Sequence, residues 1–145
     1  MANKIFQHSH RVTYAECTAG NHIYYSRYFD LLEAARGEFF RQIGQSFLRW
    51  QQAGTIFPVT ECHARYQTAA RYDDALSIDV WIGELARVRI SFAYRIANQT
   101  GREIMTAETR HVCTALDEKI KRVPEELAAR LHPYLFVPET LPQSG

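Results

Sequence analysis

YFDLLEAARGEFFRQIG, residues 28–44, is the stretch that decides the fold of this chain. Its apolar residues recur at the three- and four-residue spacing of an α-helix, and further aromatic residues occupy its other faces. A helix that is apolar on most sides is usually buried on most sides, so we expect a sheet to wrap around it. Gly44 follows the last periodic residue and is expected to end the helix there.

Strands are expected on both sides of this helix in the sequence. One covers residues 5–14, and four more lie between residues 56 and 116. Apolar and polar residues alternate over residues 76–83 and 89–96, which is typical of antiparallel strands with one buried face. A short helix is expected at residues 125–131. The order of elements predicts an α+β fold, in which a five-stranded antiparallel sheet curls around one long central helix.

The composition is that of a single globular domain. The chain has 145 residues, of which 46% are hydrophobic and 23% charged, and this excludes wholesale disorder. Seventeen basic and sixteen acidic residues nearly balance, which argues against a nucleic-acid binding protein. We expect no membrane insertion, because no apolar run approaches the length of a membrane span. The odd number of cysteines, three, favours reduced thiols and a cytoplasmic location. One domain over residues 1–145 is expected, with a frayed tail at 139–145.

A motif leads into the central helix and continues on it. Residues 11–28 read RVTYAECTAGNHIYYSRY, and Glu33-Ala-Ala-Arg36 follows. This pattern resembles the signature of hotdog-fold acyl-CoA thioesterases, in the branch of the 4-hydroxybenzoyl-CoA and Tol-Pal-associated thioesterases. The sequence around Glu61 and the stretch YQTAARYDD, residues 66–74, resemble the second strand of that group and the turn after it.

The resemblance implies a function as well as the hotdog fold. Members of this group hydrolyse the thioester that links an acyl group to coenzyme A or to an acyl carrier protein, and they need no cofactor. Their active sites lie at the interface of a homodimer or homotetramer, and such pairing also satisfies exposed edge strands. We expect no metal site, because no spacing of His and Cys matches a known zinc signature.

Two positions of the motif carry the expected chemistry. The resemblance assigns the stabilisation of the oxyanion to the backbone N–H of Tyr25, where the first amides of a helix are unpaired and lie at the positive end of its dipole. Counting ten residues back from Tyr28 places the catalytic aspartate of the family on Thr18. A threonine hydroxyl cannot act as a base near neutral pH, so Thr18 is expected to position the water or the acyl group.

Because Thr18 stands where the family has its catalytic aspartate, the sequence does not identify the general base. The candidates are Glu16, Glu33, Glu61 and His22. Alternatively, the oxyanion site and ordered water suffice, as in the hotdog thioesterases of enediyne polyketide pathways, which this chain also resembles and which lack an acid at this position. We predict thioester hydrolysis, and the alternative is a protein that binds acyl thioesters without hydrolysing them.

Basic residues and His22 are expected to bind the substrate. The resemblance places Arg87 and Arg89 where the family presents cations to the nucleotide of coenzyme A, and guanidinium groups bind phosphate well. Solvated turn charges are the competing interpretation for these two residues. Arg36 is expected to bind substrate and also to pair with Glu33, three residues before it on the helix.

Overall fold

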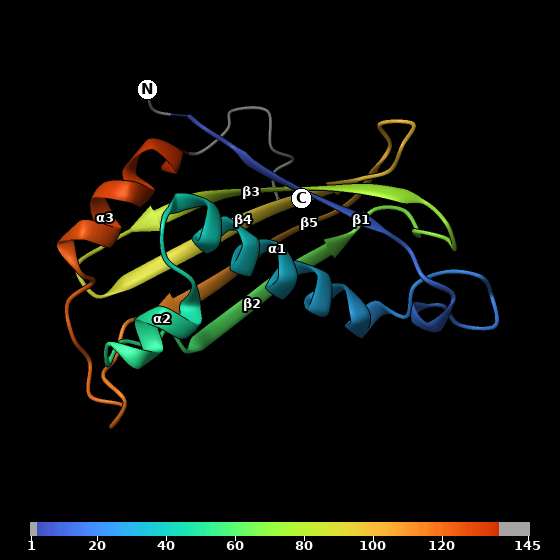
Figure 1. Ribbon diagram of the computed structural model, residues 1–145. Coiled ribbons are helices and arrows are strands. Elements are labelled where there is room, and N and C mark those ends of the chain that lie inside the picture. Colours follow the sequence, from blue (N-terminus) through green and yellow to red (C-terminus); the bar gives the residue numbers. More distant parts are fainter. Residues whose placement is uncertain (1–2, 137–145) are drawn as a thin grey trace.

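The computed structural model describes residues 3–136, so the tail expected at 139–145 lies outside the described residues. The chain forms five strands, three α-helices and three short 3₁₀ helices in this range (Figure 1). In order they are β1 (Phe6–Arg11), 3₁₀ turns at Tyr14–Glu16 and Tyr25–Arg27, α1 (Tyr28–Ile43), α2 (Phe47–Gln52), β2 (Val59–Tyr66), β3 (Ala75–Leu85), β4 (Arg89–Ala97), β5 (Glu103–Val112), α3 (Glu125–Leu131) and a 3₁₀ turn at His132–Tyr134.

All five strands belong to one antiparallel sheet with the order β1-β3-β4-β5-β2. The long helix α1 lies across one face of this sheet (Figure 1). We call the face toward α1 the helix face and the opposite one the outer face. The predicted α+β architecture, a five-stranded antiparallel sheet with one long helix, is therefore confirmed.

Alternation along the strands supplies the core between sheet and helix. Buried residues at every second position of β3 and β4 point to the helix face, as the period of two requires. An aromatic cluster joins the layers, with the ring of Phe92 5.8 Å from Phe40 and 6.3 Å from Phe39. From α1 the core receives Tyr28, Leu31, Leu32, Ala35, Phe39 and Phe40.

The central helix ends where the sequence predicted. Gly44 has φ 132°, a backbone conformation that side chains with a Cβ rarely adopt. The guanidinium of Arg130 on α3 donates to the carbonyl of Ile43 and would collide with any Cβ on Gly44. α3 therefore closes the C-terminal end of α1.

Two expectations about extent are corrected. The strand expected at residues 5–14 ends at Arg11, because Thr13 and Glu16 form a reciprocal capping box that starts the first 3₁₀ turn. The helix α1 is not buried on most sides, since the sheet covers one side and leaves Glu33, Ala34, Glu38 and Arg41 exposed. Between residues 3 and 136 no helix is both long and apolar enough to span a membrane.

Candidate functional site

The motif residues before α1 fold into a closed loop. The N–H of Thr18 donates to the carbonyl of His22 at 2.9 Å, and Cys17 and Ile23 form an isolated antiparallel bridge. The N–H of Tyr24 then donates to the carbonyl of Glu16 at 3.3 Å. These bonds fix the loop at the point where α1 begins.

Tyr25 offers an unpaired backbone donor. It is the first residue of the 3₁₀ turn that runs into α1, and within residues 3–136 its N–H has no hydrogen-bond acceptor. The carbonyl of Tyr25 accepts the hydroxyl of Tyr66 at 2.9 Å, which ties this turn to the end of β2. The Tyr25 side chain is 60% exposed. The donor that the resemblance pointed to is therefore uncapped at the surface of the single chain.

Thr18 and His22 border the same small space above Gly20. A Cβ added to Gly20 would lie 3.1 Å from His22 Nε2 and 3.8 Å from Thr18 Oγ1. His22 Nδ1 lies 3.3 Å from the carbonyl oxygen of Ile23. Because a carbonyl only accepts, a hydrogen bond here requires the proton on Nδ1, and in the neutral ring the lone pair is then on Nε2. The loop thus presents the hydroxyl of Thr18 and a ring nitrogen of His22 to the same space.

Glu16 is engaged in holding the loop together. Its Oε1 accepts the N–H of Thr13 at 2.8 Å and lies 2.9 Å from His10 Nε2. Partial burial raises the pKa of the Glu16 carboxyl, but the bonds from Thr13 and His10 outweigh this effect, so its pKa lies below the usual value. A carboxylate with a lowered pKa is a weak base, and we assign Glu16 a capping role.

Glu61 lies on the outer face, away from the loop. The Tyr66 ring packs on Tyr28 of α1, with 5.3 Å between the centroids, so Tyr66 is on the helix face. Glu61 is five positions away in a regularly paired stretch of β2, which turns its side chain to the other face and places it about 17 Å along the strand. There it contacts His63 at 3.2 Å and Arg110 at 3.5 Å.

The expected ion pair between Glu33 and Arg36 is not formed. Arg36 is half-buried, and its Nη1 donates to the hydroxyl of Tyr94 on β4 at 3.4 Å. Glu33 is exposed to solvent, so it does not carry the burial penalty that would make a partner necessary. Neither side chain forms an ion pair within the described part of the chain.

Arg87 and Arg89 lie at the far end of the sheet from Tyr25. Both are exposed, at and just after the turn between β3 and β4. The ladder places Met105 of β5 between Ile96 of β4 and Tyr66 of β2, so Ile96 is level with Tyr66 in the sheet. Arg89 lies seven residues before Ile96 on β4. This separation is about 23 Å along the strand, so a single chain does not bring these arginines to the loop.

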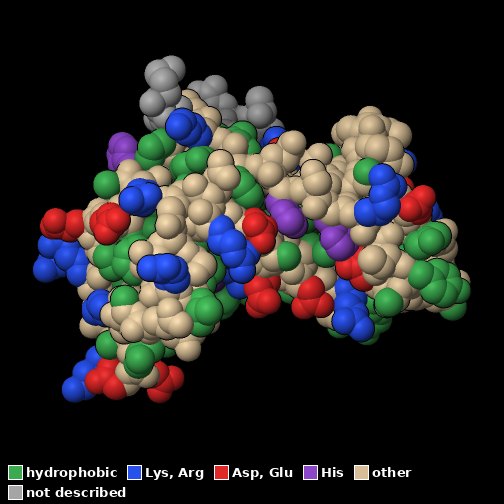
Figure 2. Space-filling view, in the orientation of Figure 1, with side chains coloured by type: hydrophobic (Ala, Val, Ile, Leu, Met, Phe, Trp, Pro, Cys, Tyr) green, Lys and Arg blue, Asp and Glu red, His purple; other side chains and the backbone are tan. Residues whose placement is uncertain are grey.

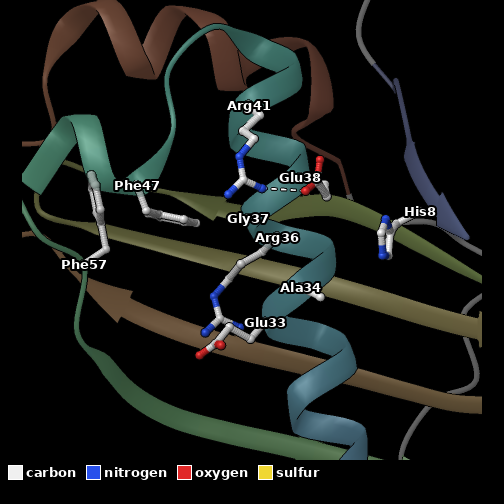
Figure 3. Close-up of a pocket in the computed structure, with 9 residues that line it drawn as sticks. All are labelled: His8, Glu33, Ala34, Arg36, Gly37, Glu38, Arg41, Phe47 and Phe57. Carbon is white, nitrogen blue, oxygen red and sulfur yellow. Dashed lines mark hydrogen bonds and ion pairs between the residues drawn. The ribbon is translucent and has the colours of Figure 1, made fainter. Parts of the chain in front are cut away.

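A cavity of about 520 Å³ opens beside α1 (Figure 3). Arg36 and Glu33 line its middle, and Arg41 lies one turn further along the helix, where it pairs with Glu38. Phe47 and Phe57 form one end, and His8 of β1 lies at the other side of the helix. On this side of the molecule, most visible Lys and Arg side chains gather at the end with α2 and α3 (Figure 2).

A buried polar chain supports Arg36 from the sheet, and our sequence reasoning missed it. The Tyr94 hydroxyl lies 2.6 Å from Thr109 Oγ1, which lies 2.9 Å from His111 Nε2. His111 Nδ1 contacts the carbonyl of Phe57 at 2.9 Å. Burial lowers the pKa of His111 to about 4, although the Phe57 carbonyl acts in the opposite direction. The sequence signal that could have revealed this network is the polar residues at positions of β4 and β5 that face the helix.

The described residues give no support for a metal centre. Among residues 3–136 no three His, Cys, Asp or Glu side chains are grouped so that they could hold a metal ion. The two histidines of β1 and the one of β2, His63, lie at opposite edges of the sheet, because the strand order separates them by three strands.

Comparison with known proteins places the fold. A family model described as the thioesterase-like superfamily matches residues 12–131. The acyl-CoA thioesterase YbgC of Haemophilus influenzae is 32% identical over 127 residues, which cover 84% of this chain and 90% of that protein. The crystal structure of a hypothetical protein from Aquifex aeolicus matches with a TM-score of 0.83 and 27% identity. The match covers 87% of this chain and 98% of that one.

A second solved structure supports the fold alone. A 1,4-dihydroxy-2-naphthoyl-CoA thioesterase from Synechocystis has a TM-score of 0.82 at 18% identity, and the match covers 88% of this chain and 96% of that one. Together with the antiparallel sheet and its central helix, these likenesses confirm the predicted hotdog fold.

Proposed function

The chain belongs to the thioesterase-like superfamily, and we propose that it hydrolyses acyl thioesters of coenzyme A to the free acid and the thiol. The unpaired N–H of Tyr25 at the start of the α1 segment is the observation that carries this proposal. Relatives named as acyl-CoA thioesterases support coenzyme A as the carrier rather than an acyl carrier protein. The narrower assignment to the 4-hydroxybenzoyl-CoA and Tol-Pal-associated branch stays a prediction.

The proposed reaction uses three groups of the loop. The thioester carbonyl accepts the N–H of Tyr25, which stabilises the negative charge that develops on its oxygen. Thr18 Oγ1 orients a water molecule, and His22 Nε2 takes a proton from it as the oxygen attacks the carbonyl carbon. The tetrahedral intermediate then expels the thiolate, and His22 returns the proton to the sulfur. The geometry favours His22 over Glu16 and Glu61 as the general base. Glu16 is held in the capping box, and Glu61 lies on the outer face.

Two copies of the chain are proposed to form the working unit. β2 is an edge strand, and seven of its eight residues are exposed in the single chain. An exposed edge of this length is a template for strand pairing. Antiparallel pairing of two β2 strands would bring the Tyr25 end of one copy beside the Phe57 end of the cavity in the other. The dimer would then have two equivalent sites at its interface.

A single substitution can remove the proposed oxyanion donor. Proline is compatible with position 25, because this is the first residue of the 3₁₀ turn and Tyr24 before it is extended, with ψ 135°. Tyr25→Pro loses the N–H, whereas Tyr25→Ala loses only the ring and keeps the donor. We expect kcat of the proline variant to be about 10² to 10³ lower than that of the alanine variant.

The assay is release of thiol from a panel of acyl-CoAs, with circular dichroism to verify that both variants are folded. Equal rates for the two variants would contradict the role of the Tyr25 N–H. Tight binding of acyl-CoA by the unmodified chain without any thiol release would contradict hydrolysis and support a non-hydrolytic binding protein.

A further inference from the structure

Arg36 is a half-buried cation with no negative charge behind it. Its recorded contact is the hydroxyl of Tyr94, and it forms no ion pair within residues 3–136. The chain of hydrogen bonds behind Tyr94 runs through Thr109 to His111. Burial lowers the pKa of His111 to about 4, so the hydrogen-bonded residues behind Arg36 carry no charge at pH 7. The guanidinium is therefore fixed in place from the sheet without being neutralised by it.

Glu33 is the matching anion in the same cavity. It lies one turn before Arg36 on α1, and both side chains line the cavity (Figure 3). Glu33 also forms no ion pair in the described part of the chain. One turn later, Glu38 and Arg41 do pair with each other. The middle of the cavity thus presents one donor group and one acceptor group, and neither has a partner of opposite charge among residues 3–136.

Three kinds of ligand group would meet this pair differently. An alkyl group would displace the water around both charges and return no hydrogen bond. A carboxylate would bind Arg36 but lie against Glu33. A hydroxyl oxygen can accept from the guanidinium and donate its proton to the carboxylate, so it satisfies both. The charge pattern therefore favours a neutral group that both donates and accepts.

We propose that Arg36 and Glu33 form a subsite for a hydroxyl group carried by the distal part of the acyl chain. Within one copy, eight residues of α-helix, about 12 Å, separate Tyr28 from Arg36, so a hydroxyl bound here lies well beyond a thioester held by the Tyr25 N–H of that copy. This span exceeds a single aromatic ring and suits a medium-length chain. Space is available beside the subsite, because a Cβ placed on Gly37 would meet nothing within 4 Å. The assignment of this ligand to the acyl group rests on the proposed thioesterase function.

Binding of non-hydrolysable analogues tests the subsite independently of catalysis. The probes are alkyl thioethers of coenzyme A in a series of medium chain lengths, each made in three forms with a terminal methyl, hydroxyl or carboxylate. Calorimetry on the full chain gives the dissociation constant of each. At the best-fitting length we expect the hydroxyl form to bind about 10-fold more tightly than the methyl form. Thiol release from the corresponding thioesters is measured in parallel, so that a failure of hydrolysis is seen separately from a failure of the subsite.

Two variants and a control locate the effect. Glu33→Ala changes an exposed helix position and is expected to fold normally, and Arg36→Met removes the cation. Each is expected to reduce the preference for hydroxyl over methyl to less than about threefold. Arg49→Gln removes one positive charge from an exposed position of α2 outside the cavity, and should keep the preference.

Three results would overturn the proposal. One is equal binding of hydroxyl and methyl forms at every length, and another is tightest binding of the carboxylate form. The third is a loss of affinity for all forms alike in Arg36→Met together with a lower sedimentation coefficient, since Arg36 would then serve the pairing of two copies.

Discussion

Polar side chains cluster on both sides of the sheet, but only the cluster on the helix side is buried. The helix-face cluster forms one continuous chain of hydrogen bonds through Arg36, Tyr94, Thr109 and His111. The outer-face cluster consists of exposed ion pairs among Glu61, His63, Glu108 and Arg110. Exposed pairs are screened by water and contribute little, whereas buried hydrogen bonds fix the positions of their members. The difference supports our proposal that the chemistry of this chain lies on the helix side.

The largest effect expected from this comparison concerns the general base. His22 lies in the loop that leads into α1. In His22→Gln the glutamine side chain cannot take up a proton, so the proposed base is lost. We expect kcat for acyl-CoA hydrolysis to fall about 10²- to 10⁴-fold, because a general base typically contributes that much. Glu61→Gln is the matched control on the outer face and should keep the rate of the unmodified chain.

The two variants are compared by steady-state kinetics after each has been verified as folded. A large loss in Glu61→Gln with little change in His22→Gln would reverse the assignment of the base. It would also show that the outer face reaches the reaction, for example through a second copy of the chain.

The two clusters are also expected to differ in how the stability they contribute depends on pH. Burial holds the pKa of His111 at about 4, against 6.5 for a free histidine. The native His111 therefore stays neutral while the unfolded chain takes up a proton below pH 6.5, so the stability contributed by this neutral group is lost as the pH falls from 6.5 to 4. The difference of about 2.5 pKa values corresponds to about 3 kcal/mol.

Urea unfolding at pH 7 and at pH 4.5 measures this contribution. In His111→Gln the free energy of unfolding should fall less between these two pH values than in the unmodified chain. His63→Gln removes a histidine from the outer face and leaves the buried chain intact, so it should keep the decrease that His111 causes. Equal decreases in the unmodified chain and in His111→Gln would contradict the buried, neutral state of His111.

The sequence predicted the fold well because the fold depends on local periodicity. The spacing of apolar residues over residues 28–43 and the alternation in β3 and β4 each follow from which side is buried. The free N–H of Tyr25 also follows from its place at the start of a helical segment.

The candidate site was less predictable, since it depends on which face and which end of the sheet a residue reaches. Glu61 was a candidate base in sequence, and only the register of β2 against β5 shows that it lies on the outer face. Arg36 was expected to pair with its neighbour on the helix, but its partner Tyr94 is 58 residues away. Contacts between distant segments have no periodic signal in a single sequence.

The smallest expected effect tests the link between helix and sheet. Tyr94→Phe removes one buried hydroxyl, which contacts Thr109 at 2.6 Å and Arg36 at 3.4 Å, and leaves the ring in the core. We expect the free energy of unfolding to fall by about 1–2 kcal/mol, because the two partners lose a hydrogen bond in a buried place. Tyr72→Phe is the matched control, since that ring is half exposed, and should change stability by less than about 0.5 kcal/mol. Equal effects of the two substitutions would mean that the buried hydroxyl of the helix face contributes no more to stability than an exposed one. That result would contradict the contrast between the buried and the exposed polar clusters.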